Sequence, residues 1–131
     1  MQELRNIGIS DSTIKSMIEL NPEVLELSDN EVLEKEKILS DLDCDNIQIL
    51  NIISSNPNFL TRTSSNILEL ILYLKKLGFN CLNILFDSNP YILNFEPFEV
   101  QNYVSERIKN GESIEDIVDD LDSNPYLFNE M

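Results

Sequence analysis

The dipeptide Asn-Pro occurs four times in the chain, and its regular spacing constrains the fold more than any other feature. The pairs are Asn21-Pro22, Asn56-Pro57, Asn89-Pro90 and Asn124-Pro125, at intervals of 35, 33 and 35 residues. Proline disfavours the helical region for the residue before it, so each pair predicts the end of a helix. A period of this length is typical of repeats made of two helices. The sequence therefore predicts four helical repeats.

Apolar residues stand at fixed distances from each Asn-Pro pair. Three residues before the Asn stand Ile18, Ile53, Phe86 and Leu121. After the Pro, each copy has two adjacent apolar residues: Val24-Leu25, Phe59-Leu60, Ile92-Leu93 and Leu127-Phe128. We expect a helix before each pair and a single 3₁₀ turn after it, which places its two apolar side chains under the helices.

A turn residue lies thirteen residues before the Asn in three copies and eleven before it in the third, which has a two-residue deletion. These residues are Gly8, Asp43, Gly78 and Gly111. Glycine readily adopts the left-handed conformation that ends a helix, and aspartate tolerates it, so each turn predicts a junction between two helices. The first helices of the later repeats are expected at about 30–42, 66–77 and 97–110, after the start signals Ser28-Asp29-Asn30-Glu31, Thr63-Ser64-Ser65-Asn66 and Pro97.

The predicted fold is all-α, a solenoid of about four two-helix repeats in a single domain, 1–131. The repeats are expected at about 1–27, which is partial, 28–62, 63–95 and 96–131. The helix at 66–77 is apolar nearly all round and is expected to pack against neighbours on both sides. In the last repeat, Ser113 and Asp116 form a capping signal, and Ile114, Ile117, Val118 and Leu121 form an apolar stripe.

Composition excludes most kinds of catalytic site. The chain has no His, its three Gly lie far apart, and its two Cys, Cys44 and Cys81, cannot form a CxxC pair. Histidine is the usual general base and a common metal ligand, and phosphate-binding loops need clustered glycines. We therefore expect no catalytic, cofactor-binding or metal residues, no enzymatic activity, and two reduced, partly buried thiols.

The chain shows no targeting signal in its first residues. The start, MQELRNIGIS, lacks the features of a signal peptide or a transit peptide, and no apolar run is long enough to span a membrane. We expect a soluble, cytoplasmic protein that does not contact the membrane.

The repeat unit resembles that of the mitochondrial transcription termination factor family. The best match is LKKLGFNCLNILFDSNPYILNF at residues 74–95, and similar segments lie at 39–60, 5–25 and 107–128. The resemblance implies repeats of two α-helices and one 3₁₀ helix, stacked into a right-handed superhelix whose concave, basic side holds nucleic acid.

Net charge favours a protein partner over nucleic acid. The chain has 24 acidic and 9 basic residues, a net charge of −15, and the four repeats carry −3, −4, 0 and −8. Neutralisation of phosphates supplies most of the affinity for nucleic acid, so such a chain is poorly suited to bind it. We predict a binding module for a protein. The alternative is a nucleic-acid-binding regulator that uses Arg62, Lys75 and Lys76 in and beside the neutral repeat.

The acidic helix of the last repeat is the candidate docking surface for a basic protein. Its residues are Glu112, Glu115, Asp116, Asp119, Asp120 and Asp122. Such a surface can also be an ordinary solvated face. Tyr91 and Tyr126, which share one position after the Pro, are expected to be half-exposed. A third possibility is self-association through the terminal repeat, where Leu127-Phe128 would form an exposed apolar end.

Overall fold

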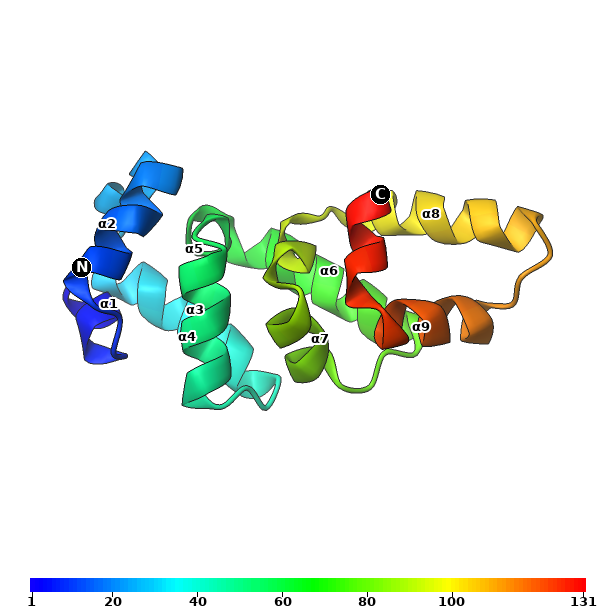
Figure 1. Ribbon diagram of the computed structural model, residues 1–131, viewed down its shortest axis with the longest axis horizontal. Helices are drawn as coiled ribbons and strands as arrows, with labels where there is room; N and C mark the ends of the chain where they lie inside the picture. Colours follow the sequence, from blue (N-terminus) through cyan, green and yellow to red (C-terminus); the bar gives the residue numbers. More distant parts are fainter. The chain divides into compact units, whose positions relative to one another are not determined.

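The computed structural model describes residues 1–131 and contains helices, turns and loops but no strand. The chain divides into two compact units, Met1–Ser64 and Ser65–Met131, and each holds two of the predicted repeats (Figure 1). The all-α, helical-repeat fold is therefore confirmed, whereas the single domain over 1–131 stays a prediction.

The first unit contains five α-helices and one 3₁₀ helix. They are α1 (Gln2–Asn6), α2 (Asp11–Leu20), η1 (Pro22–Glu26), α3 (Asp29–Asp41), α4 (Asn46–Ser55) and α5 (Asn58–Thr61). Helix α3 packs against α1, α4 and α5, while α2 packs against α4 and η1. The core of this unit therefore lies around α3 and α4, with Leu39, Ile52 and Ile53 fully buried.

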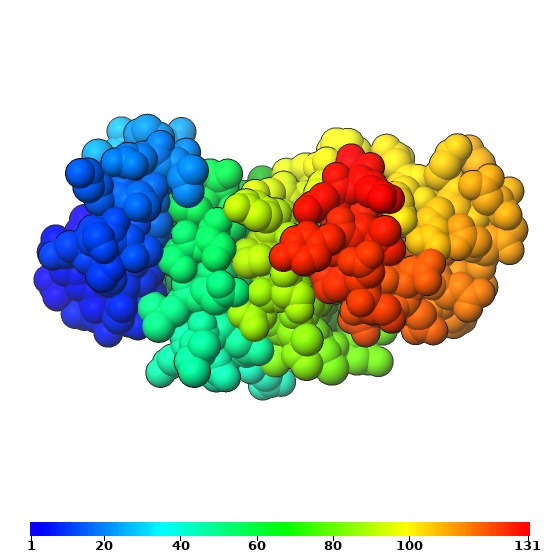
Figure 2. Space-filling view, in the orientation of Figure 1, coloured from blue at the N-terminus to red at the C-terminus, as the bar shows by residue number.

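The second unit repeats this order of helices. It contains α6 (Ser64–Leu77), whose first residue ends the first unit, then α7 (Leu82–Ser88), η2 (Pro90–Asn94), α8 (Pro97–Lys109), α9 (Ile114–Ser123) and η3 (Pro125–Glu130). Helix α9 packs against α8 and η3, and η3 also packs against η2. In Figure 2 the red η3 lies beside the yellow-green η2 on the visible face of this unit.

The turn residues act as the sequence predicts. Gly8, Gly78 and Gly111 have φ angles of 104°, 114° and 92°, and Asp43 is the one non-glycine residue with a positive φ, 68°. Each follows the first helix of its repeat, where the left-handed conformation ends the helix. The predicted first helices are confirmed to within two residues at each end.

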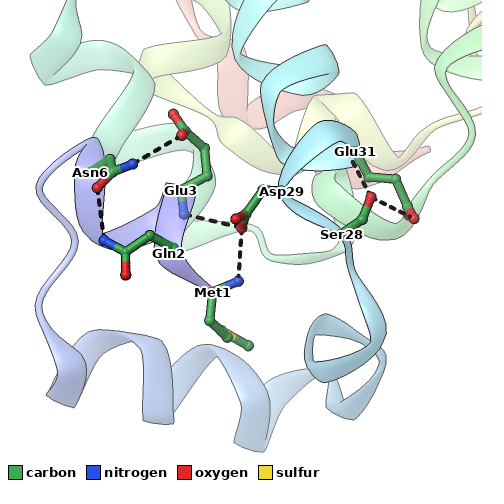
Figure 3. Close-up of polar contacts among 7 residues, drawn as sticks. All are labelled: Met1, Gln2, Glu3, Asn6, Ser28, Asp29 and Glu31. Atoms are coloured by element: carbon green, nitrogen blue, oxygen red, sulfur yellow. Dashed lines mark hydrogen bonds and ion pairs between the residues drawn. The ribbon is translucent and has the colours of Figure 1, made fainter.

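Side chains cap several helices at the predicted positions. The hydroxyl of Ser28 accepts a hydrogen bond from the amide of Glu31 at 3.2 Å, and that of Ser113 accepts one from Asp116 at 3.1 Å. Pro97 is the first residue of α8, where its missing N–H costs nothing. Asp29, beside Ser28, accepts bonds from the amide of Glu3 and the amino group of Met1, both at 3.2 Å (Figure 3).

The asparagine of the first Asn-Pro pair links two successive repeats. The side-chain amide of Asn21 donates to the Oδ1 atom of Asn58 and to the hydroxyl of Thr61, each at 2.9 Å. Both acceptors belong to α5, the short helix of the next repeat. The Oδ1 atom of Asn21 meanwhile accepts from the amide of Glu23 at 3.1 Å. One side chain thus caps its own 3₁₀ turn and holds the next short helix.

The same link recurs in the second unit. The side-chain amide of Asn89 donates to the carbonyl of Pro125 and to the Oδ1 atom of Asn129, each at 3.1 Å. The acceptors lie in η3, 36 and 40 residues further along the chain, and the acceptors of Asn21 lie 37 and 40 residues along. Asn89 is fully buried, so these bonds are made away from water. The same kind of contact therefore joins successive repeats in both units.

The terminal apolar pair does not form an exposed end, so that prediction was wrong. Phe128 is fully buried, and its ring lies 6.1 Å from that of Phe79 and 6.4 Å from that of Phe95, measured between ring centroids. Leu127 is partly buried. The 3₁₀ turn after Pro125 points Phe128 inward as the repeat pattern requires, and it leaves Tyr126 at the surface.

Three smaller expectations were also wrong. The segment after Pro57 is one α-helical turn, because the amide of Arg62 reaches the carbonyl of Asn58 at 3.0 Å; the other three segments are 3₁₀ as predicted. Ile114 is largely exposed, whereas the rest of its stripe is buried. Helix α6 is not covered all round, since Leu68 and Leu72 are exposed.

Replacing Asn89 should test the link between repeats. We expect Asn89→Ala to lower the free energy of unfolding by about 1–3 kcal/mol, because it leaves the carbonyl of Pro125 and the amide oxygen of Asn129 without this partner. Asn124→Ala is the matched control, since Asn124 is exposed, makes no side-chain hydrogen bond and should change stability by less than about 0.5 kcal/mol. Equal losses in urea denaturation of the two variants would contradict the assignment.

Candidate functional site

The acidic candidate residues lie on or just before α9, and the structure separates them into two groups. Glu115, Asp116, Asp119 and Asp122 are exposed on the helix, opposite its buried residues Ile117, Val118 and Leu121. No ion pair involves these four carboxylates. Glu112 and Asp120, by contrast, are held by a basic residue of α8. The predicted docking set of six is thus reduced to four unpaired carboxylates.

That basic residue is Arg107, which joins α8 to α9. Its Nε atom donates to the Oε2 atom of Glu112 at 2.7 Å, and its Nη2 atom pairs with the Oε1 atom of Glu112 and with Asp120. Its Nη1 atom donates to the hydroxyl of Tyr103 at 3.1 Å, and the guanidinium carbon lies 5.5 Å from the centre of that ring. The guanidinium therefore has partners from both helices and from the intervening loop.

Electrostatics at Arg107 follow from these contacts. Hydrogen bonds that Arg107 donates to Glu112 and, second in effect, to Asp120 raise the pKa of Arg107, and the guanidinium in turn lowers the pKa of Glu112. Both members of the pair stay charged at neutral pH, and Arg107 is only 17% exposed. A bidentate arginine–carboxylate pair fixes geometry as well as charge. The contact therefore orients α9 on α8 and leaves Glu115, Asp116, Asp119 and Asp122 outward.

The predicted basic patch is divided between the two units. Arg62 is half-buried in the first unit, and Lys75 and Lys76 are exposed in the last turn of α6 in the second. Neither lysine forms an ion pair. Cations near the C-terminus of a helix favour its dipole, which explains two adjacent lysines at this end. The structure thus assigns two of the three residues to one surface.

Other basic residues are engaged inside the chain. Arg5 pairs with Asp11 at 2.8 Å and Lys37 with Asp41 at 3.0 Å. Lys35, on α3, is only 4% exposed, and its Nζ atom donates to the carbonyl of Leu60 at 3.3 Å. Burial lowers the pKa of the Lys35 ammonium. With Arg107, at least four of the nine basic residues are therefore committed to intrachain contacts.

A carboxyl pair between α1 and α3 was missed in the sequence. The Oε2 atom of Glu36 is buried without a hydrogen-bond partner, and Glu3 faces it from α1. Burial, followed by the neighbouring Glu3 carboxyl, raises the pKa of Glu36 to about 7. The carboxyl of Glu3 also accepts from the side-chain amide of Asn6 at 3.3 Å (Figure 3). No sequence signal identifies this pair, because Glu3 and Glu36 belong to helices of different repeats and meet only through the packing of α1 on α3.

The two tyrosines and the two cysteines singled out in the sequence differ in exposure. Tyr91 and Tyr126 are 51% and 62% exposed, as predicted, and lie on the adjacent η2 and η3. Both cysteines are free, but Cys44 is buried whereas Cys81 is exposed. None of the helices combines the length and the apolar character that crossing a lipid bilayer requires.

Comparison with known proteins gives one finding. The model of the mTERF family matches residues 1–121, which include the first three Asn-Pro pairs and end within α9. No curated protein and no solved structure matches the chain significantly. The match covers both units and supports the repeat assignment.

Replacing Glu36 should remove part of the pH dependence of the free energy of unfolding. The pKa of Glu36 is raised in the folded state, so its contribution is greatest at low pH and is lost as the pH rises through about 7. We expect Glu36→Gln to raise the free energy of unfolding at pH 8 by about 1 kcal/mol and to have a smaller effect at pH 5. Urea denaturation at both values measures this.

Glu19→Gln, an exposed acidic residue of the same unit, is the matched control. A gain for Glu36→Gln that is the same at both pH values, or is matched by Glu19→Gln, would contradict the buried-carboxyl explanation.

Proposed function

The chain belongs to the mTERF family, and we propose that it is a non-enzymatic helical-repeat module that binds a protein partner. The observation that carries this proposal is the distribution of unpaired charge. Four exposed carboxylates on α9 form no ion pair within the chain, whereas at least four of the nine basic residues are already engaged. A partner with a basic surface would find complementary charge here.

The acidic face of α9, formed by Glu115, Asp116, Asp119 and Asp122, is the proposed contact surface. Arg107 fixes the helix on α8 through Glu112 and Asp120, so the four carboxylates stand on a supported element. Like charges held close together repel one another, and a basic partner would relieve this repulsion on binding. Complementary charge of this kind raises the association rate and makes it sensitive to salt.

A nucleic-acid-binding role, as the family resemblance implies, is the second candidate. The observation that favours it is the pair Lys75 and Lys76, exposed and without ion pairs on one helix. Two phosphate contacts supply little affinity against a net charge of −15. The charge distribution therefore supports the protein partner more strongly.

Neutralising the acidic face of α9 should abolish recovery of the partner. In affinity capture with the full chain, we expect Glu115→Gln, Asp116→Asn, Asp119→Asn and Asp122→Asn together to lose most of the captured protein. The matched control neutralises four exposed acidic residues elsewhere, Glu19, Glu23, Glu26 and Glu106, and so changes the net charge equally. Equal loss in both variants, or none in the first, would contradict the proposed surface.

A further inference from the structure

A second surface, of different character, lies on α6 and the start of α8. Leu68 and Leu72 are one helical turn apart and are 50% and 59% exposed. Phe98, in the first turn of α8, is 60% exposed. Large apolar side chains elsewhere on α6 are buried, namely those of Ile67, Leu70, Ile71 and Leu74. The two exposed leucines therefore form a separate stripe, which folding of this chain does not use.

A groove begins at Leu72 of this stripe. It is lined by Glu69, Leu72, Tyr73, Lys76 and Pro97, and we call it the α6–α8 groove. Glu69, Leu72, Tyr73 and Lys76 follow one another at spacings of three, one and three residues, which place them along one side of α6. Pro97 closes the groove from the first position of α8. Its lining therefore includes an apolar side chain, Leu72, and a cationic one, Lys76.

The charge around the α6–α8 groove differs from that of the rest of the chain. Lys75 and Lys76 stand without ion pairs at one end, and Glu69 is the one acidic residue that lines the groove. The four lining residues on α6 lie in the repeat with a net charge of 0, and Pro97 belongs to the last repeat, with Glu96 and Glu99 close to it in sequence. A carboxylate on a partner would meet two unpaired ammonium groups here and strong repulsion on α9.

We propose that the α6–α8 groove docks a segment of a partner protein that carries an apolar side chain beside carboxylates. The apolar side chain packs on Leu72 and Pro97, with Leu68 and Phe98 beside it, and the carboxylates pair with Lys75 and Lys76. Burial of a leucine-sized side chain supplies the affinity, and the charge pairs select the orientation. This surface is independent of the acidic face of α9, so either assignment can fail without the other.

Other occupants fit these observations less well. Nucleic acid would use the two lysines but would leave the exposed leucines in water. A second copy of the chain would have to approach against a charge of −15 on each molecule. An acidic segment with an apolar anchor uses both the leucines and the lysines, and it is short enough to avoid the acidic helices.

A selection of short random-sequence peptides by mRNA display against the full chain tests this proposal at physiological salt. We expect enriched peptides to place Leu, Ile or Phe next to Asp or Glu and to bind in the micromolar range. Binding measured by fluorescence anisotropy should weaken by at least about tenfold in Leu72→Asp and, separately, in Lys75→Gln with Lys76→Gln. Circular dichroism should confirm that each variant is folded.

Matched controls separate this surface from general effects of charge and exposure. Leu20→Asp changes a leucine that is 71% exposed in the first unit, and Lys15→Gln with Lys109→Gln removes two exposed lysines without ion pairs. Neither should alter peptide binding, and neither should the neutralised α9 variant.

Three results would overturn the proposal. The first is a selection that enriches no peptide with an apolar residue beside an acidic one. A selection whose enriched peptides bind the groove variants and the control variants equally would count the same way. The second is concentration-dependent dimerisation in light scattering that Leu72→Asp abolishes, which would assign the surface to a second copy. The third is binding of labelled RNA or DNA that needs Lys75 and Lys76 but not Leu72.

Discussion

The hydrogen bonds donated by the side-chain amide of the Asn-Pro motif are the interaction on which the repeat architecture depends. In each unit an asparagine ends one helix and reaches the short helix of the next repeat, through Asn21 in the first unit and Asn89 in the second. The proline that follows starts the short helix, which points apolar residues such as Phe128 into the core. A two-residue motif thereby ends a helix, begins a turn and couples neighbouring repeats.

Much of the fold could be predicted because its signals are local and repeat four times. Proline spacing, the turn residues and the apolar offsets place nearly every helix, and the left-handed conformation of Asp43 follows from its position alone. The burial of Lys35 could also have been predicted, since it stands between Val32 and Leu39 on the apolar face of α3. The position of Lys35 on the helix predicts its burial, whereas its charge alone predicts exposure.

The candidate site was less predictable because its contacts are not local. Arg107 lies 13 residues from Asp120, and no spacing rule pairs them across a loop, so the acidic set was first identified without its internal partner. Glu36 and Glu3 meet only through the packing of α1 on α3, which no spacing in the sequence specifies. Exposure of Leu72 depends on which side of α6 the tertiary structure covers. In each case the sequence shows which residue is present, but tertiary packing determines whether its side chain is paired, buried or exposed.

The two surfaces proposed for binding differ in charge. Helix α9 presents carboxylates without ion pairs, and α6 presents lysines without ion pairs beside exposed apolar side chains. Such a division suits recognition of protein surfaces better than of a uniform polyanion. Fluorescence anisotropy of the full chain with labelled single-stranded DNA, duplex DNA and RNA pools, at low and high salt, tests this claim most directly. A protein-binding module should show no micromolar binding to any pool even at low salt. Micromolar binding that weakens steeply with salt would contradict the account and restore a nucleic-acid role.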